Sequence, residues 1–274
     1  MELGINIRNW GPTATREFLT ESAKIVDNSS LDALWFNDHI GFPPEIKNNV
    51  FGVPKEMGSI IDPLGLACYF ASVTRRVRFG TGVLVLPYRP ALLTNKLLTA
   101  IQVLSDNRFL LGIGAGYLAE EFQALGVSIK KRGQITDDTL NLLNESSKNA
   151  LVESNGQEFL LEPKLTKPPI YIGQNAEIAF ERTIKYGDGW MPVSQTPEEL
   201  KPKIETFQSM AVDAGRGRLE VVAMKTLPLE NHSQACEVFE AYKDVGVSQL
   251  VHTQGYDSLQ QYADIVNQVE SLRI

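Results

Sequence analysis

The sequence is poor in the residues from which zinc sites, disulfides and membrane spans are built. It has two cysteines and three histidines in 274 residues, and the HExxH pattern is absent. Cys68 and Cys236 lie far apart in the chain and share no metal or redox spacing, so we expect no metal site. No apolar run reaches the roughly 18 residues of a membrane span, and the N-terminus lacks the layout of a signal peptide. These absences predict a soluble, cytoplasmic protein.

The sequence also has no excess of positive charge. Lys and Arg number 26 against 33 Asp and Glu, which gives a formal net charge of −7, without long runs of one sign. Such a chain attracts neither nucleic acid nor an anionic membrane. Its 43% hydrophobic and 22% charged residues are typical of a globular protein. We therefore expect a small-molecule substrate as its partner.

Short apolar segments alternate with helical segments along the whole chain. Several are nearly continuous in apolar residues, as in parallel strands that are buried on both faces. At about 34 residues per unit, the alternation predicts an α/β fold, a single-domain (β/α)8 TIM barrel over residues 1–274, rather than an open doubly wound sheet. The predicted strands are Leu3–Ile7, Ala33–Asn37, Val77–Leu86, Phe109–Ala115, Pro169–Gly173, Gly189–Val193, Glu220–Met224 and Gln249–Thr253.

Local signals mark where two of the helices begin. Asp62 can cap a helix whose first position is Pro63. Thr196 precedes Pro197, and Glu199 completes a capping-box sequence. Both starts follow a predicted strand and its loop, as the barrel requires.

Two insertions interrupt the alternation of strands and helices. Phe42–Ile61 is a long loop after the second strand, and Asn149–Thr166 contains Asn155-Gly156 between apolar pairs, which predicts a hairpin. In a barrel, the long loops that follow strands lie at the C-terminal face, where chemistry occurs. We expect both insertions, together with the side chains at the strand ends, to determine which substrate binds there.

Two histidines fall at predicted strand ends. Asp38 and His39 follow the second strand, and His252 lies near the end of the eighth. A histidine that titrates near neutrality beside a carboxylate can move a proton at a reacting centre. The alternative for His39 is a loop histidine bonded to a neighbouring carbonyl, and the residues alone leave both interpretations open.

Glycines interrupt the third and fourth predicted strands. Gly80 and Gly82 flank Thr81 in the third strand, which indicates either a bulge that a flat ligand approaches or room for a neighbouring strand. Gly112–Gly116 ends the fourth strand, but its G-x-G-x-G spacing is not the dinucleotide fingerprint. We interpret it as backbone that approaches a ligand. Glu120 and Glu121 follow, and we expect them in a solvated first helical turn.

A glycine turn also follows the fifth predicted strand. Gly173-Gln174-Asn175 leads into a helix, where free backbone N–H groups can hold a phosphate. The alternative is that Asn175 only caps the helix. Either interpretation places the turn at the C-terminal face.

Long stretches of the chain resemble the bacterial luciferase-like flavin-dependent oxidoreductases. The motifs that carry the resemblance occur in the family's order: LDALWFNDHI, DPLGLACYFASVTRRVRFGTGVLVLP, LLTNKLLTAIQVLSDNRFLLGIGAGYLAEEFQALGV, KKRG and PPIYIGQNAEIAFERTIKYGDGW. The chain is especially similar to the subgroup that uses coenzyme F420, a deazaflavin. The resemblance implies a barrel that holds the ring of reduced FMN or of coenzyme F420 across its C-terminal mouth.

The same resemblance implies roles for particular residues. Asp38 and His39 match the family's DH pair, in which the histidine acts near the reactive ring atom, and we expect Asp38 to hold His39. Thr81, Gly82 and Val83 match the bulge that supports the ring through a non-proline cis peptide, here Gly82-Val83.

Further residues match the family's cofactor-binding turns. Gly114, Ala115 and Gly116 correspond to the turn after the fourth strand. Gly173, Gln174 and Asn175 correspond to the phosphate-binding turn, which often reads Gly-Gly, so Gln174 departs from the pattern. Tyr117 stands where deazaflavin-dependent sugar-phosphate dehydrogenases carry an acidic residue, so that substrate is not expected.

The sequence therefore predicts a flavin- or F420-dependent oxidoreductase. The enzyme would act either by hydride transfer or as a monooxygenase. An FMN enzyme of this kind would be fed by a separate flavin reductase, and homodimers are common in the family. The alternative is a catalytically silent flavin-binding barrel. A metal-dependent hydrolase on the same fold would need more strand-end ligands than His39 and His252 supply.

Overall fold

The computed structural model describes residues 1–45 and 59–273, and within these residues eight parallel strands close into a barrel. The predicted barrel is confirmed, with each predicted strand in place. The strands are β1 (Glu2–Asn6), β2 (Ala33–Phe36), β3 (Arg78–Val85), β4 (Phe109–Gly114), β7 (Ile170–Gly173), β8 (Gly189–Met191), β9 (Glu220–Lys225) and β10 (Gln249–His252). Around the barrel they follow the order β1-β10-β9-β8-β7-β4-β3-β2, and β2 pairs with β1 to close it.

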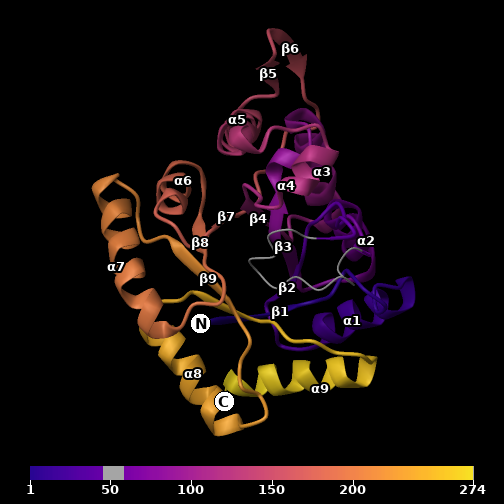
Figure 1. Cartoon of the computed structure of the whole chain (residues 1–274), viewed down its shortest axis with the longest axis vertical. Coiled ribbons are helices and arrows are strands. Elements are labelled where there is room, and N and C mark those ends of the chain that lie inside the picture. The colour runs from indigo at the N-terminus through magenta and orange to yellow at the C-terminus, as the bar shows by residue number, and fades with distance from the viewer. Residues whose placement is uncertain (46–58, 274) are drawn as a thin grey trace.

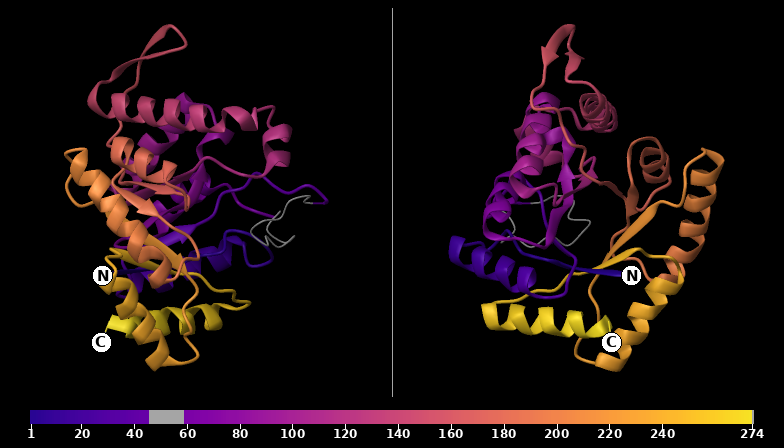
Figure 2. Two further views of the ribbon diagram at one scale, coloured as in Figure 1. Left: turned by 60° about the vertical axis from the view of Figure 1, so that its left-hand side comes forward. Right: turned by 180° about the vertical axis from the view of Figure 1, so that it is seen from behind.

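Helices surround the strands as an outer ring (Figure 1). They are α1 (Arg16–Asn28), α2 (Pro63–Val73), α3 (Ala91–Ser105), α4 (Ala119–Ala124), α5 (Arg132–Lys148), α6 (Ile178–Tyr186), α7 (Pro197–Asp213), α8 (His232–Asp244) and α9 (Leu259–Glu270), with the short 3-10 helices η2 (Leu86–Tyr88), η3 (Ile129–Lys131) and η4 (Ser271–Arg273). The predicted hairpin is β5 (Leu151–Ser154) with β6 (Gln157–Leu160), and it projects beyond α5 (Figure 2). It connects α5 to β7, and such helix-to-strand connections lie at the end of the barrel opposite the C-terminal face, so the expectation that Asn149–Thr166 helps to determine the substrate is wrong.

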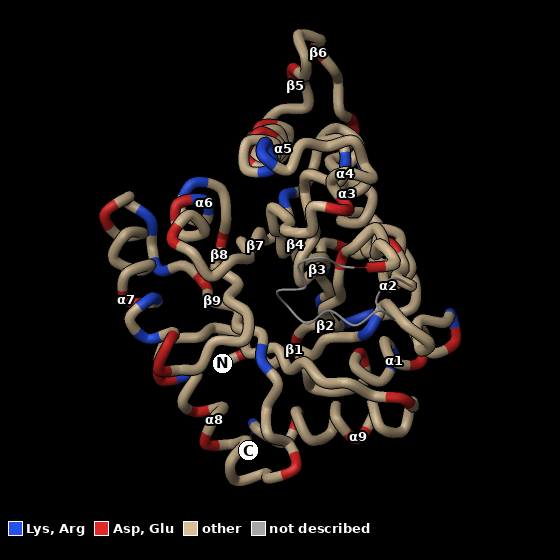
Figure 3. The backbone as a smooth tube through the Cα atoms, in the orientation of Figure 1, with Lys and Arg blue, Asp and Glu red and all other residues tan. Residues whose placement is uncertain are grey.

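Two layers of buried side chains result from the alternation along each strand. Residues such as Trp35, Leu110, Tyr171 and Val251 belong to one buried cluster, which fills the barrel. Their strand neighbours, for example Leu34, belong to a larger cluster that also takes in apolar side chains of the helices. Most Lys, Arg, Asp and Glu lie on the helices and the connecting loops (Figure 3). The strand ends are thus carried by a rigid, apolar scaffold.

The predicted helix starts are confirmed. The Asp62 carboxylate accepts hydrogen bonds from Leu64 N and Gly65 N at the start of α2. Thr196 and Glu199 form the capping box of α7. The predicted loop Phe42–Ile61 lies largely outside the described residues, because residues 46–58 are not described. In the described part of the chain, no helix is both long and apolar enough to cross a membrane.

We expect Thr196→Ala to lower the free energy of unfolding by about 1 kcal/mol, because the substitution removes a capping side chain. In a chain of this size the melting temperature would fall by about 2–4 °C. Thr206→Ala is the matched control, since the Thr206 hydroxyl donates only to Pro202 O within the same helix. Equal melting temperatures for the two variants in a thermal denaturation experiment would contradict the prediction.

Candidate active site

The mouth of the barrel contains a cavity of about 350 Å³. It lies at the C-terminal ends of β1, β2, β3, β8, β9 and β10, which is where the barrel fold places active sites. The residues that line it are Asn6, Arg8, Trp10, Asn37, Gly82, Val193, Met224, Thr226, Thr253, Gln254 and Gly255. Of the predicted cofactor-binding residues, Gly82 alone belongs to this lining.

Strand β3 is irregular beside the cavity. Its pairing with β4 shifts register between Thr81 and Leu84, and the Gly82-Val83 peptide is cis, so the predicted bulge and the predicted cis peptide are both confirmed. The Asn37 amide donates to Gly82 O at 3.2 Å. Thr81 is fully buried, and its hydroxyl donates to Gly112 O at 2.7 Å, so this side chain does not face the mouth.

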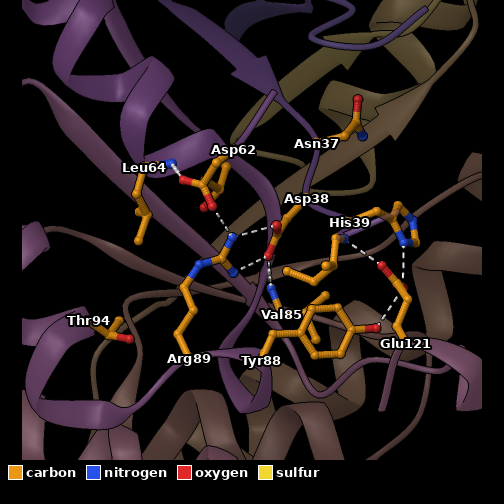
Figure 4. A network of polar contacts seen from close by, with 12 residues as sticks. Asn37, Asp38, His39, Asp62, Leu64, Val85, Tyr88, Arg89, Thr94 and Glu121 are labelled. Atoms are coloured by element: carbon orange, nitrogen blue, oxygen red, sulfur yellow. Dashed lines mark hydrogen bonds and ion pairs between the residues drawn. The ribbon is translucent and has the colours of Figure 1, made fainter. Parts of the chain in front are cut away.

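A histidine–glutamate pair follows β2. His39, the predicted catalytic residue, is not among the residues that line the cavity, and its side chain is 10% exposed. The Nδ1 atom of His39 lies 2.8 Å from Glu121 Oε2, and the hydroxyl of Tyr88 donates to the same oxygen at 2.7 Å. Glu121 is 3% exposed, and it also accepts a hydrogen bond from Ile40 N. Figure 4 shows His39 and Tyr88 pointing toward this carboxylate. The expectation of a solvated Glu121 is therefore wrong, because α4 turns this residue inward.

The surroundings of Glu121 keep it ionised. Burial by itself raises the pKa of the carboxyl, but the hydrogen bonds from His39, Tyr88 and Ile40 and the charge of His39 bring it below its ordinary value. An ionised carboxylate can only accept hydrogen bonds, so Nδ1 of His39 carries a proton. Nε2 is then the nitrogen that can take up or deliver a proton. The rings of Phe42 and Tyr117 flank the imidazole, at centroid distances of 4.7 and 6.0 Å.

Asp38 does not hold His39, and that part of the prediction is wrong. Its carboxylate oxygens lie 2.7 and 2.8 Å from the guanidinium nitrogens of Arg89, and Val85 N donates to it at 2.8 Å. Arg89 also contacts the Asp62 carboxylate at 2.6 Å (Figure 4). The Asp38 side chain is fully buried, so this bidentate pair fixes the end of β2 against the end of β3.

The glycines that end β4 and β7 face Val83 of the β3 bulge. A Cβ atom on Gly114 would lie 2.8 Å from Val83 Cγ2, and one on Gly173 would lie 2.8 Å from Val83 Cγ1. Gly116 has a φ of 78°, a backbone conformation that favours glycine. The lining of the cavity includes neither Ala115 nor these glycines. Packing against β3 accounts for Gly114 and Gly173, so an approaching ligand is not needed to explain them.

Hydrogen bonds hold the predicted phosphate-binding turn, Gly173-Gln174-Asn175, against β8 and the residues that follow it. The Asn175 amide exchanges two hydrogen bonds with the backbone of Val193, both at 3.1 Å, and the indole N–H of Trp190 donates to Gln174 O. Asn175 therefore does not cap α6, whose N-cap is Glu177. Within the described chain no hydrogen bond uses the backbone N–H groups of residues 174–176, so they remain able to bind an anion. Gln174 has a φ of 145°, a backbone conformation that favours glycine. This agrees with the Gly-Gly often found at this turn, and Gln174 adopts the same conformation although it departs from that pattern.

His252 is buried below the mouth and is neutral. Burial lowers its pKa to about 4, and it accepts a hydrogen bond from Leu227 N at 3.2 Å through Nδ1. Its Nε2 lies 2.9 Å from Gln254 Oε1. A neutral imidazole has one N–H, so the proton is on Nε2 and is donated to Gln254. His252 orients Gln254 rather than facing the cavity itself.

Sequence patterns did not point to several residues that line the cavity. Asn6, Arg8, Trp10 and Gln254 belong to no motif, and their position at or shortly after the end of β1 or β10 was the signal that could have indicated them. They become recognisable as a group only when the barrel closes β1 against β10.

Comparison with known proteins agrees with this geometry. The family model of the luciferase-like monooxygenases matches residues 2–266. The chain belongs to this family.

Relatives and structural neighbours of the luciferase-like chain differ in what they bind. An uncharacterized protein of Mycobacterium tuberculosis is 26% identical over 251 residues, which are 85% of this chain and 84% of that one. An F420-dependent secondary alcohol dehydrogenase in complex with an F420-acetone adduct has a TM-score of 0.77 at 16% identity and covers 99% of this chain and 98% of its own.

The oxygenating constituent of 3,6-diketocamphane monooxygenase from Pseudomonas putida, in complex with FMN, has a TM-score of 0.75 at 13% identity, over 98% of this chain and 96% of its own. At such identities the two structures support the fold alone.

We expect Asp38→Asn to destabilise the luciferase-like barrel by about 3 kcal/mol, because the buried Arg89 would keep its charge and lose its bidentate partner. Asp62→Asn is the control: it removes the exposed partner of the same guanidinium, and asparagine still caps α2. The measurement is the free energy of unfolding in urea. An equal loss of unfolding free energy in the two variants would contradict the stabilising role of the Asp38–Arg89 pair.

His252 should stay neutral in the folded protein down to a pH of about 4. The unfolded chain binds a proton below about pH 6.5, so stability is lost as the pH falls from 6.5 toward 4. Histidine-selective NMR can follow this, since the chain has three histidines, and His252→Gln identifies the signal. A signal from His252 that titrates near pH 6.5 would contradict both its burial and its tautomer.

Proposed function

We propose that this chain is an oxidoreductase that holds reduced FMN or coenzyme F420 across the barrel mouth and acts on a small organic substrate. The observation that carries the proposal is the His39–Glu121 pair beside the β3 bulge. A buried carboxylate fixes one imidazole nitrogen, and the other is the nitrogen through which His39 would exchange a proton. Membership of the luciferase-like monooxygenases is consistent with this chemistry.

The residues present fit a tricyclic ring with a phosphate-bearing side chain. The backbone of Gly82 borders the cavity, and Val83 packs between glycines of the two following strands of the barrel, which would give the ring a firm support. The turn that follows β7 offers the backbone N–H groups of Gln174, Asn175 and Ala176 for the phosphate.

When bound, either cofactor supplies hydride transfer, and reduced FMN also supplies activation of O₂. The chain contributes orientation and proton movement. His39 Nε2 takes or gives the proton of the substrate group that changes charge, and Glu121 keeps the imidazole in one tautomer. Phe42 and Tyr117 restrict access of water to the ring of His39.

The choice between the two cofactors is decided by titration of the purified protein with reduced FMN, oxidised FMN and coenzyme F420, followed by fluorescence. Tight binding of F420 alone supports a hydride-transfer enzyme. Tight binding of reduced FMN supports a monooxygenase that depends on a separate flavin reductase. Binding of neither by the folded protein contradicts the proposal, and binding without turnover of any substrate favours the catalytically silent barrel.

We expect His39→Ala to lower kcat by about 10²–10⁴-fold, the usual contribution of a general acid or base, while cofactor affinity stays within a few-fold. Glu121→Gln keeps the shape of the side chain but removes the charge that selects the tautomer. It should shift the pH profile of kcat and lower kcat less than His39→Ala does. Kinetics with the cofactor that binds measure both effects, and unchanged kcat in His39→Ala would sink the assignment.

A further inference from the structure

Among the described residues that line the mouth cavity, Arg8 is the one that carries a formal charge. Arg8 follows β1, and its Cζ lies 4.7 Å from the centroid of the Trp10 ring and 5.5 Å from that of Tyr256. Arg8 forms no salt bridge with any residue of the described chain. Its Nη1 donates to Tyr256 O at 3.4 Å. Because no carboxylate neutralises this half-buried cation in a chain of net charge −7, the guanidinium can accept an anionic ligand.

The neighbours of Arg8 hold it in place. A Cβ atom on Gly255 would lie 2.2 Å from Arg8 Nη2, so the glycine leaves room for the guanidinium in its present position. The hydroxyl of Tyr256 accepts a hydrogen bond from Arg8 N at 2.6 Å. The Tyr256 ring is stacked on Phe18 at 5.6 Å and packs against Tyr262 at 4.6 Å. The guanidinium is therefore preorganised on a rigid aromatic support.

Two amides add hydrogen-bond donors on the same side of the cavity. Asn6 Nδ2 is buried and has no acceptor in the described protein, which is costly unless a ligand supplies one. The Oε1 atom of Gln254 is occupied by the Nε2–H of His252, which leaves the Gln254 NH₂ group to donate. Arg8, Asn6 and Gln254 thus present donors from the adjacent strand ends of β1 and β10.

We propose that this side of the mouth binds the carboxylate of the substrate, so that the substrate is a small organic acid. The proposal rests on the proposed function and names its substrate class. A planar guanidinium with flanking amide donors matches the oxygens of a carboxylate. In the strand order, β1 and β7 are separated by β10, β9 and β8, so Arg8 lies across the barrel from the turn Gly173–Asn175. The cofactor phosphate and the substrate carboxylate have separate places.

The test compares carboxylates with their uncharged amides. Benzoate and octanoate, and benzamide and octanamide, are titrated calorimetrically into the full chain, both alone and with whichever cofactor binds. We expect at least one carboxylate to bind, its amide to bind at least tenfold more weakly, and Arg8→Gln to weaken the carboxylate about 10–100-fold. The amide's affinity should not change in Arg8→Gln.

Two further variants control for charge and folding. Arg8→Lys retains the charge and should recover part of the affinity. Arg75→Gln removes the same charge at an exposed residue between α2 and β3, at the opposite end of the barrel, and should leave binding unchanged. Melting temperatures of all variants establish that each is folded. Failure of both carboxylates to bind, or equal binding to the wild type and folded Arg8→Gln, would overturn the proposal.

The cofactor's own phosphate is the other source of an anion for Arg8. FMN is compared with riboflavin, and F420 with the deazaflavin that lacks the phosphate, in the wild type and in Arg8→Gln. A loss confined to the phosphorylated compounds would assign Arg8 to the cofactor and overturn the proposal. If neither cofactor binds but carboxylates bind through Arg8, the proposed function fails and the acid site stands. If a cofactor binds and the affinity for carboxylates is the same in the wild type and in Arg8→Gln, the proposed function stands and the proposed acid site fails.

Discussion

The buried carboxylate of Glu121 is the group on which the arrangement of the mouth depends. It lies on α4, and it accepts hydrogen bonds from His39 and Ile40 after β2 and from Tyr88 in η2, directly after β3. A buried carboxylate without such donors would cost several kcal/mol, so the three segments are stable only as a unit. His39, on a loop that would otherwise let its ring rotate, is positioned by a residue 82 positions later in the chain. The site is therefore an outcome of barrel closure and not of a local motif.

Asp38 and His39 show how adjacent residues acquire different tasks. Their side chains leave the backbone in different directions, one toward Arg89 and the other toward Glu121 (Figure 4). Both carboxylate oxygens of Asp38 are paired with the guanidinium of Arg89, so the Asp38 side chain holds the strand ends together. The imidazole keeps one nitrogen available. This separation lets His39 change its protonation state without disturbing the ion pair that fixes the loop, which a single shared Asp–His pair would not allow.

Features that depend on short stretches of sequence could be predicted, and features that depend on contacts between distant segments could not. The strands follow from apolar runs, and the starts of α2 and α7 follow from Asp62 and Thr196. The cis peptide at Gly82-Val83 followed from the family resemblance. Glu121 resembled any acidic residue of a first helical turn, because nothing in its neighbourhood indicates that α4 turns inward. Arg8 likewise has no local signature, since its support comes from Tyr256 at the other end of the chain.

The two sides of the mouth differ in what they can bind, and this difference constrains how a reaction would proceed. The turn Gly173–Asn175 offers backbone N–H groups on the β7 side, and Arg8 offers a side-chain cation on the β1 side. A cofactor and a substrate that are both anions, held from opposite edges, would meet above the β3 bulge, where His39 is available for proton transfer. Packing fixes the anchoring groups at both edges before a ligand arrives. Binding would therefore cost little side-chain conformational entropy. On this proposal the barrel would contribute chiefly by setting the distance between two anion sites, and the chemistry would be left to the cofactor.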